Sequence, residues 1–134
     1  MGPLTLDQFT EKLSAQHPER KLAALTQLWE SFGLQFAFLE SSGANAFAAS
    51  VVSEEAVGTL KEVAGLITLQ LTPFREVMCG GLRERADSVQ LFFMVGEKEL
   101  HLTWPCALPS ALEDPAFRWL VQRVRQGFDP APRR

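Results

Sequence analysis

The sequence is poor in the residues that most often carry chemistry. It has two cysteines, Cys79 and Cys106, and two histidines, His17 and His101, whereas a metal site needs a cluster of His, Cys or carboxylate ligands. It contains no G-x-x-x-x-G-K-[ST] or G-x-G-x-x-G motif, so we interpret Gly80-Gly81 as helix termination or close packing. A Cys106–His101 nucleophile pair would lack an identifiable third group to orient it. We therefore expect no enzyme activity, no cofactor, no metal and no small-molecule substrate.

Long apolar runs and an excess of positive charge are also lacking. No run approaches the roughly 20 apolar residues of a membrane span, and the five charged residues among the first 20 do not fit a signal peptide. The formal net charge is −3, whereas a nucleic-acid clamp carries a strong basic excess. With 46% hydrophobic and 22% charged residues, the composition is that of a globular protein. We expect a soluble, intracellular protein with reduced, buried thiols.

The length fits one domain. A chain of 134 residues can bury roughly two thirds of its unfolded surface. The sequence shows no internal repeat, so we expect a single globular domain over residues 1–128. Residues 129–134, with Pro130 and Pro132, are expected to form a loose tail.

The beginning of the chain is predicted to be helical. Residues 5–32 show two apolar stripes at helical spacing, and Thr5 with Gln8 forms a capping-box pattern. His17-Pro18 should separate two helices, because the residue before a proline avoids the helical region. Gly33 is expected to end the second helix.

Alternating patterns predict two β-hairpins. The first joins Leu34–Leu39 to Ala46–Val52 across a polar turn. The second joins Ser88–Val95 to Glu99–Trp104, with Gly96-Glu97-Lys98 as its turn. Both hairpins indicate antiparallel sheet.

The segment between the hairpins, Ser53–Leu82, is predicted to form two short helices. Ser53 is a good N-cap residue, and Glu54 and Glu55 would place negative charge at the helix N-terminus. Pro73 would start the second helix, because a proline at the first helical position loses only an amide that has no partner. The predicted fold is therefore α+β: an antiparallel sheet or sandwich head with a helix-turn-helix insert, an N-terminal helical segment and a C-terminal helix.

A last helix is predicted to begin at Asp114-Pro115 and to end at Gly127. Arginines crowd this end of the chain beside Trp119, and arginine with an aromatic residue can contact phosphate and stack on bases. The alternative is a solvated helix face with cations near the negative end of the helix dipole. Trp119 lies off the apolar stripe and is either a core residue or a partner-binding residue. The candidate nucleic-acid contacts are Arg118, Arg123 and Arg125.

From Leu34 to about Gln126, the order of predicted elements resembles the head domains of the end-joining scaffold superfamily, which includes the ligase IV-binding scaffold, XLF and PAXX. In this chain, LQFAFLESSGANAFAASVVSEEA resembles the strand–turn–strand run of the family and its entry into a helix. The segment GTLKEVAGLITLQLTPFREVMCGGL resembles the helix pair of the family, and SVQLFFMVGEKELHLTW resembles its closing hairpin. The family heads usually begin with strands and lead into a coiled-coil stalk. The helical N-terminus and the two tail prolines of this chain depart from that pattern.

The resemblance implies a non-enzymatic scaffold that acts in the nucleus, in DNA double-strand break repair by end joining, through self-association or binding of repair factors. Lys98 lies near the position where basic head residues of the family meet a partner, so Lys98 and Trp119 are the candidate partner contacts. One alternative is a centriolar or cytoskeletal assembly scaffold in the cytoplasm, because the centriolar cartwheel protein is a structural cousin. Another is a roadblock- or longin-like adaptor for small GTPase regulation, whose α/β layout also fits the predicted order of elements.

Overall fold

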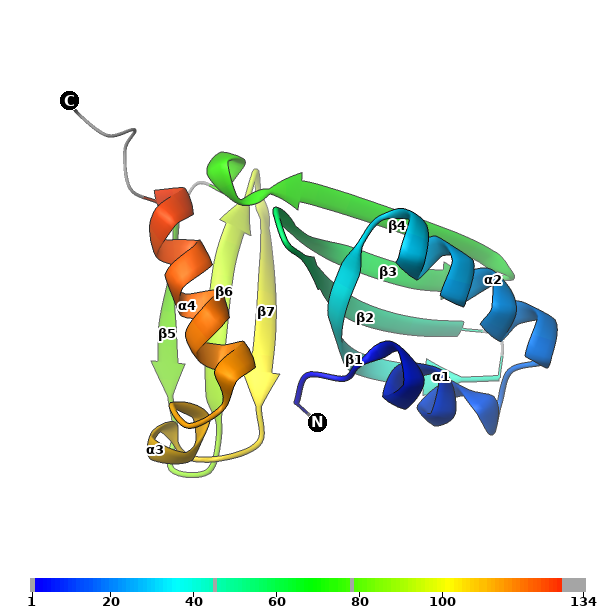
Figure 1. Ribbon diagram of the computed structural model, residues 1–134, viewed down its shortest axis with the longest axis horizontal. Coiled ribbons are helices and arrows are strands. Elements are labelled where there is room, and N and C mark those ends of the chain that lie inside the picture. The colour runs from blue at the N-terminus through cyan, green and yellow to red at the C-terminus, as the bar shows by residue number, and fades with distance from the viewer. Residues whose placement is uncertain (1, 45, 78, 129–134) are drawn as a thin grey trace. The chain divides into compact units, whose positions relative to one another are not determined.

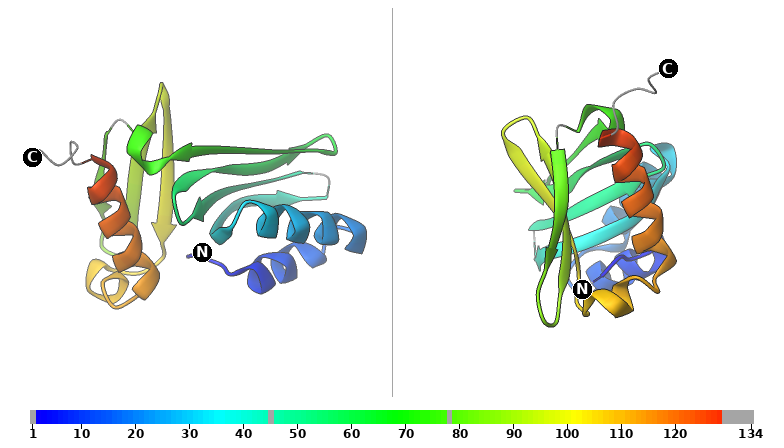
Figure 2. Two further views of the ribbon diagram at one scale, coloured as in Figure 1. Left: turned by 45° about the horizontal axis from the view of Figure 1, so that its top comes forward. Right: turned by 90° about the vertical axis from the view of Figure 1, so that its left-hand side faces the viewer.

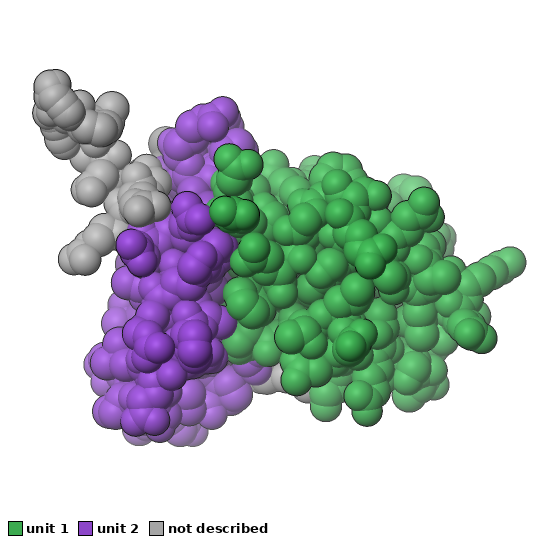
Figure 3. Space-filling view, viewed as in Figure 1, with its two compact units in different colours: residues 1, 3–71 green, residues 2, 72–134 purple. Residues whose placement is uncertain are grey.

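The computed structural model describes residues 2–44, 46–77 and 79–128, without the side chains of residue 79 and residues 124–128. Their contacts divide the chain into two compact units, residues 3–71 and residues 72–128, which Figure 3 colours separately. Each unit combines helix with an antiparallel sheet (Figure 1), so the predicted α+β class is confirmed. The single domain over residues 1–128 stays a prediction.

Two helices open the first unit, as predicted. Helix α1 spans Leu6–Ser14 and helix α2 spans Glu19–Ser31. The capping box is present: the Thr5 amide donates to Gln8 Oε1 at 3.0 Å, and the Gln8 amide donates to Thr5 Oγ1 at 3.4 Å. Pro18 is the N-cap of α2 in an extended conformation, so the chain turns between the helices at the predicted place.

The sheet of the first unit is an antiparallel meander. Strands β1 (Leu34–Gly43), β2 (Ala46–Ser53), β3 (Ala56–Val63) and β4 (Leu66–Pro73) lie side by side in the order β1-β2-β3-β4. Helices α1 and α2 cover one face of this sheet (Figure 2). Between them lies the core of the unit, whose fully buried side chains include Phe9, Leu13, Leu25, Val51 and Leu60.

The predicted helix-turn-helix insert over Ser53–Leu82 is wrong, because most of this segment is β-strand. Ser53 does not cap a helix: its Oγ accepts hydrogen bonds from the amides of Ala56 at 3.0 Å and Glu55 at 3.4 Å. Those bonds close the turn from β2 to β3. A serine that hydrogen-bonds the backbone two or three residues later serves a turn as well as it serves a helix.

A two-residue turn, rather than a helix–helix connection, lies at the centre of the segment. Ala64 has φ 53° and Gly65 has φ 83°, the pair of left-handed conformations that a type I′ hairpin turn requires. The strands that this turn joins approach closely, since a Cβ atom at Gly58 would lie 1.8 Å from the carbonyl oxygen of Gln70. Pro73 precedes a single 3-10 turn, η1 (Phe74–Glu76), instead of an α-helix.

The second unit carries a three-stranded antiparallel sheet in the order β5-β6-β7. Its strands are β5 (Cys79–Glu84), β6 (Val89–Val95) and β7 (Lys98–Trp104), so the second predicted hairpin is confirmed. A short helix, α3 (Leu108–Ala111), follows β7.

The last helix begins where the sequence predicted. Helix α4 spans Pro115–Phe128 and lies along one face of the three-stranded sheet (Figure 2). Asp114 precedes it and accepts hydrogen bonds from the Ala116 amide at 2.9 Å and from Trp104 Nε1 at 3.0 Å. The rings of Trp104 and Phe117 then meet edge to face at 4.8 Å. One aspartate thus fixes both the start of the helix and the tryptophan of β7.

Candidate functional site

The predicted nucleic-acid contacts on α4 interact within their own unit. Arg118 donates through Nη1 to the carbonyl oxygen of Leu112 at 2.9 Å, which holds the arginine over the end of α3. The Arg123 guanidinium lies 5.1 Å from the centroid of the half-buried Trp119 ring, within the range of a cation–π contact. The side chain of Arg125 lies outside the described residues. Nucleic-acid binding by this helix stays a prediction.

The other sequence candidates lie at separate places. Lys98 is exposed at the start of β7, and it shares no described contact with Trp119 on α4. Cys106 is a free, half-buried thiol after β7, while His101 Nδ1 lies 3.0 Å from Glu99 Oε2. The histidine therefore has a carboxylate neighbour on its own strand.

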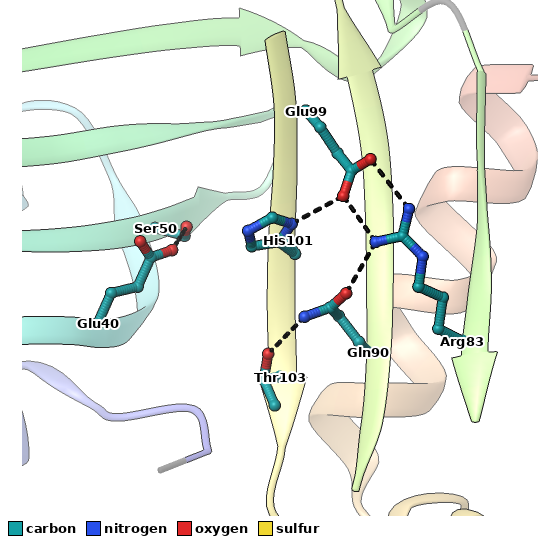
Figure 4. Close-up of polar contacts among 7 residues, drawn as sticks. All are labelled: Glu40, Ser50, Arg83, Gln90, Glu99, His101 and Thr103. Atoms are coloured by element: carbon teal, nitrogen blue, oxygen red, sulfur yellow. Dashed lines mark hydrogen bonds and ion pairs between the residues drawn. The ribbon is translucent and has the colours of Figure 1, made fainter. Parts of the chain in front are cut away.

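A polar cluster that the sequence did not predict lies on one face of the second sheet (Figure 4). Arg83 of β5 donates to both oxygens of Glu99, at 2.6 and 3.0 Å, and to Gln90 Oε1 at 3.0 Å. Gln90 donates in turn to Thr103 Oγ1 at 3.2 Å. The strand register explains the cluster, because Arg83 stands opposite Gln90 and Gln90 stands opposite Thr103. His101 completes the cluster through Glu99.

The charges of this cluster neutralise one another. The hydrogen bonds from Arg83, and then the contact with His101, lower the pKa of Glu99 to about 2. The same hydrogen bonds raise the pKa of Arg83. The Arg83 guanidinium also lies 4.1 Å from the centroid of the Phe92 ring, and that ring covers Gly81, where a Cβ atom would meet Phe92 Cζ at 2.9 Å. Gly80 and Gly81 lie in strand β5, so helix termination is wrong for them, whereas close packing is confirmed for Gly81.

A second charged cluster is buried inside the first unit. The side chains of His17 and Glu62 have no exposed surface, and Lys21 Nζ lies 2.7 Å from Glu62 Oε2 and 3.2 Å from His17 Nδ1. Neither Glu62 oxygen has a directed hydrogen bond from a described residue, so the contact with Lys21 is an ion pair. The His17 ring stands edge-on to Phe47 at 5.9 Å. This cluster fastens the connection between α1 and α2 to strand β3.

The two edges of the first sheet are built differently. At the β1 edge, Leu4 and Ala37 exchange two backbone hydrogen bonds, of 2.8 and 3.0 Å. Strand β1 also has two register irregularities, and its exposed Glu40 accepts a hydrogen bond from Ser50 at 2.7 Å (Figure 4). Extra pairing, irregular register and charge are the devices that protect sheet edges from other strands.

The β4 edge has neither the extra backbone pairing nor the charge of the β1 edge among the described residues. Strand β4 is eight residues long, carries no charged side chain, and is the outermost strand of its sheet (Figure 1). Leu66 at its start is 70% exposed. Ile67, Leu69 and Leu71 are only partly buried against the core of the unit. The β4 edge is therefore an apolar strand with backbone groups available for pairing, and it is the candidate site.

The sequence contains a signal for this site. Residues 66–74 form the run LITLQLTPF, which has no charge and alternates apolar with polar residues at its centre. The helical interpretation of the segment concealed that signal. Its position at the edge of a sheet is a property of the tertiary structure.

The described residues contain no group of three or more His, Cys, Asp or Glu side chains placed to hold a metal ion. None of the helices in the described part of the chain is long and apolar enough to span a membrane. Comparison with protein-family models, with curated proteins and with solved structures found no match.

Proposed function

We propose that this chain is a protein-interaction module that binds a β-strand of its partner along the β4 edge. An edge strand presents a row of backbone N–H and C=O groups that another strand can pair with. In this mode of recognition the main-chain hydrogen bonds supply affinity, and alternate side chains supply specificity. Strand β4, with eight residues, offers about 27 Å of such an edge.

The contrast between the two edges of one sheet is the observation that carries the proposal. The β1 edge has the backbone pairing of Leu4 with Ala37, irregular register and a charged residue, whereas β4 has no charged residue and no such outer backbone pairing among the described residues. A long, apolar, unprotected edge is an aggregation hazard unless something covers it. A partner strand paired with β4 would cover the edge and remove that hazard.

The narrower role, in DNA end joining within the nucleus, is a proposal that rests on the resemblance of the sequence to end-joining head domains. The segment that resembled the helix pair of those heads forms β3, β4 and β5, so the interaction role is argued from the β4 edge instead. The centriolar and GTPase-adaptor alternatives predict other cellular sites. Localisation to DNA damage, to centrioles or to neither distinguishes among the three.

Site-specific photo-crosslinking tests the interaction role. A photoreactive phenylalanine analogue in place of Leu66, which is 70% exposed on β4, should give protein adducts in cells. The matched control is the same analogue at Gln35, which is exposed on the protected strand β1. Adducts at Leu66 but not at Gln35 support the proposal. A Leu66 position that gives no more adduct than Gln35 contradicts it.

A further inference from the structure

The turn before β4 determines which of its backbone groups face outward. In a turn of this type, the amide of the fourth residue donates to the carbonyl of the first, which here places the Leu66 amide toward Val63 on β3. Backbone groups of an antiparallel strand alternate in direction. The amides of Ile67 and Leu69 therefore point away from β3, along the open edge.

The side chains of β4 form a pattern that is symmetric about Leu69. Ile67, Leu69 and Leu71 pack partly against the core on the side of the helices, and Thr68 and Gln70 alternate with them on the opposite face of the sheet. Reading the strand in either direction gives apolar, polar, apolar, polar, apolar. A strand with this symmetry is complementary to an antiparallel copy of itself, as a two-fold interface requires.

We infer that the partner strand is β4 of a second copy of this chain, paired antiparallel and centred on Leu69; this inference rests on the proposed function of the β4 edge. A centre at Gln70 would instead place Pro73 opposite Ile67 of the second copy, and proline has no amide to donate. A centre at Leu69 leaves Pro73 outside the paired segment.

The centred pairing matches side chains on both faces of the joined sheet. On the side of the helices, Leu69 meets Leu69 of the second copy and Ile67 meets Leu71, which are apolar cross-strand pairs. On the other side, Thr68 meets Gln70. The two four-stranded sheets become one sheet of eight strands, and the helices of both copies lie on the same face.

Charge also favours a second copy over a charged partner strand. Strand β4 has no charged residue, so the strand of a charged partner would lose hydration without meeting an opposite charge. Two copies of β4 bring no charge to the junction and bury apolar surface that each copy leaves partly exposed.

Opposite charges at Thr68 test this pairing. With the centre at Leu69, the two Thr68 side chains lie diagonally across the junction, about 7–8 Å apart. The Thr68→Glu variant and the Thr68→Lys variant should each be shifted toward monomer relative to the wild-type dimer, with a rise in the Kd of dimerisation of about tenfold or more. An equimolar mixture of the two variants should recover a dimer that contains one copy of each. Sedimentation equilibrium measures the molecular mass of the wild-type protein, of each variant and of the mixture.

The matched control is Ser41→Glu, which adds the same charge to the exposed part of the protected strand β1 and should leave the dimer intact. A wild-type protein that stays monomeric up to about 100 µM, where a dimer with a Kd of about 1 µM would be populated, overturns the inference. Dimeric Thr68 variants, or a mixture that stays monomeric, also overturn it. If Thr68→Lys does not fold, Thr68→Glu and Ser41→Glu decide the outcome by themselves.

The two proposals fail in different ways. A monomeric wild-type protein whose Leu66 position crosslinks to another protein in cells retains the interaction role and overturns the second copy as partner. A dimer in which Leu66 gives adducts of twice the monomer mass supports both. A Leu66 position without adducts overturns both.

Discussion

Each sheet of this protein carries a glutamate in an ion pair, and the two glutamates lie in opposite surroundings. Glu62 in the first unit is fully buried and faces Lys21 and His17. Glu99 in the second unit is 30% exposed and accepts two hydrogen bonds from Arg83. The buried glutamate depends on its protein partner for all its charge stabilisation, whereas water shares that role at Glu99.

Two glycines within strands also have different surroundings in the two units. A Cβ atom at Gly58 in the first unit would lie 1.8 Å from the backbone carbonyl oxygen of Gln70. A Cβ atom at Gly81 in the second unit would meet the tip of the Phe92 ring at 2.9 Å. A ring can turn, while a carbonyl in a strand cannot move without the strand. The first unit therefore has no room for a side chain at Gly58, where β3 and β4 approach closely.

The largest effect is expected from Gly58→Ala. Since the new methyl group would overlap the Gln70 carbonyl, β4 must separate from β3, and we expect a loss of unfolding free energy of at least about 4 kcal/mol. Urea denaturation of the variant measures this loss. An unfolding free energy within about 1 kcal/mol of the wild-type value would show that β3 and β4 separate easily. The two units would then not differ in this respect.

Removal of Lys21 should have the next largest effect. Lys21→Ala leaves Glu62 buried without its cation, which should lower the unfolding free energy by about 3–5 kcal/mol. The control is the same substitution in a Glu62→Gln background, where no buried charge is left behind. The double-mutant cycle should therefore give a coupling energy of at least about 1 kcal/mol. Additive effects would mean that the ion pair does not stabilise Glu62.

Gly81→Ala should be milder than Gly58→Ala. The Phe92 ring has to shift to admit the methyl group, at a cost of about 1–3 kcal/mol for overpacking. Replacement of Phe92 by Leu in the same chain should recover part of the loss, because it removes the atom that the methyl group meets. Urea denaturation of the single and double variants measures both effects. A double variant less stable than either single variant would contradict this account.

The smallest effect is expected from Arg83→Ala, and it should depend on pH. Glu99 has a pKa lowered from 4.5 to about 2 in the folded protein, so the Arg83–Glu99 pair stabilises the fold above pH 4.5 and this stabilisation is lost as the pH falls toward 2. The difference in unfolding free energy between wild type and Arg83→Ala should shrink over this range. A difference that is the same at neutral pH and at the acid end of the range would rule out the pair as its source.

Much of the fold can be predicted from the sequence where local signals agree with one another. The capping box at Thr5, the His17-Pro18 break and the Asp114-Pro115 helix start each combine a specific local hydrogen bond or steric restriction with an apolar pattern, and each is confirmed. The alternation around Gly96 likewise predicted β6 and β7 correctly.

The prediction for Ser53–Leu82 was wrong because the local signals of this segment are compatible with both a helix start and a turn between strands. Ser53 binds nearby amides in a turn as it would at a helix start, and Ala64 is an unusual residue for a left-handed conformation. The β-branched residues of β3 and β4 and the strand position of Gly58 were the signals for sheet. Long-range pairing decided between the two structures.

The clusters around Glu62 and Glu99 were beyond sequence analysis for a related reason. Lys21 on α2 and Glu62 on β3 are 41 residues apart in the sequence. Arg83 on β5 contacts Glu99 on β7 across the intervening strand β6. Only the sheet registers bring these residues together. The β4 edge depends in the same way on which strand is last in the sheet.

Amide hydrogen exchange of Ile67 and Leu69 tests most directly the central claim, that the outer edge of β4 pairs with β4 of a second copy. If β4 pairs with a second copy, these outward amides should exchange about as slowly in the concentrated protein as those of the interior strand β2, and much faster in the Thr68→Glu variant. The Leu66 amide, which faces β3, should be protected in both proteins. Fast exchange of Ile67 and Leu69 in the concentrated wild-type protein, with Leu66 protected, would contradict the account.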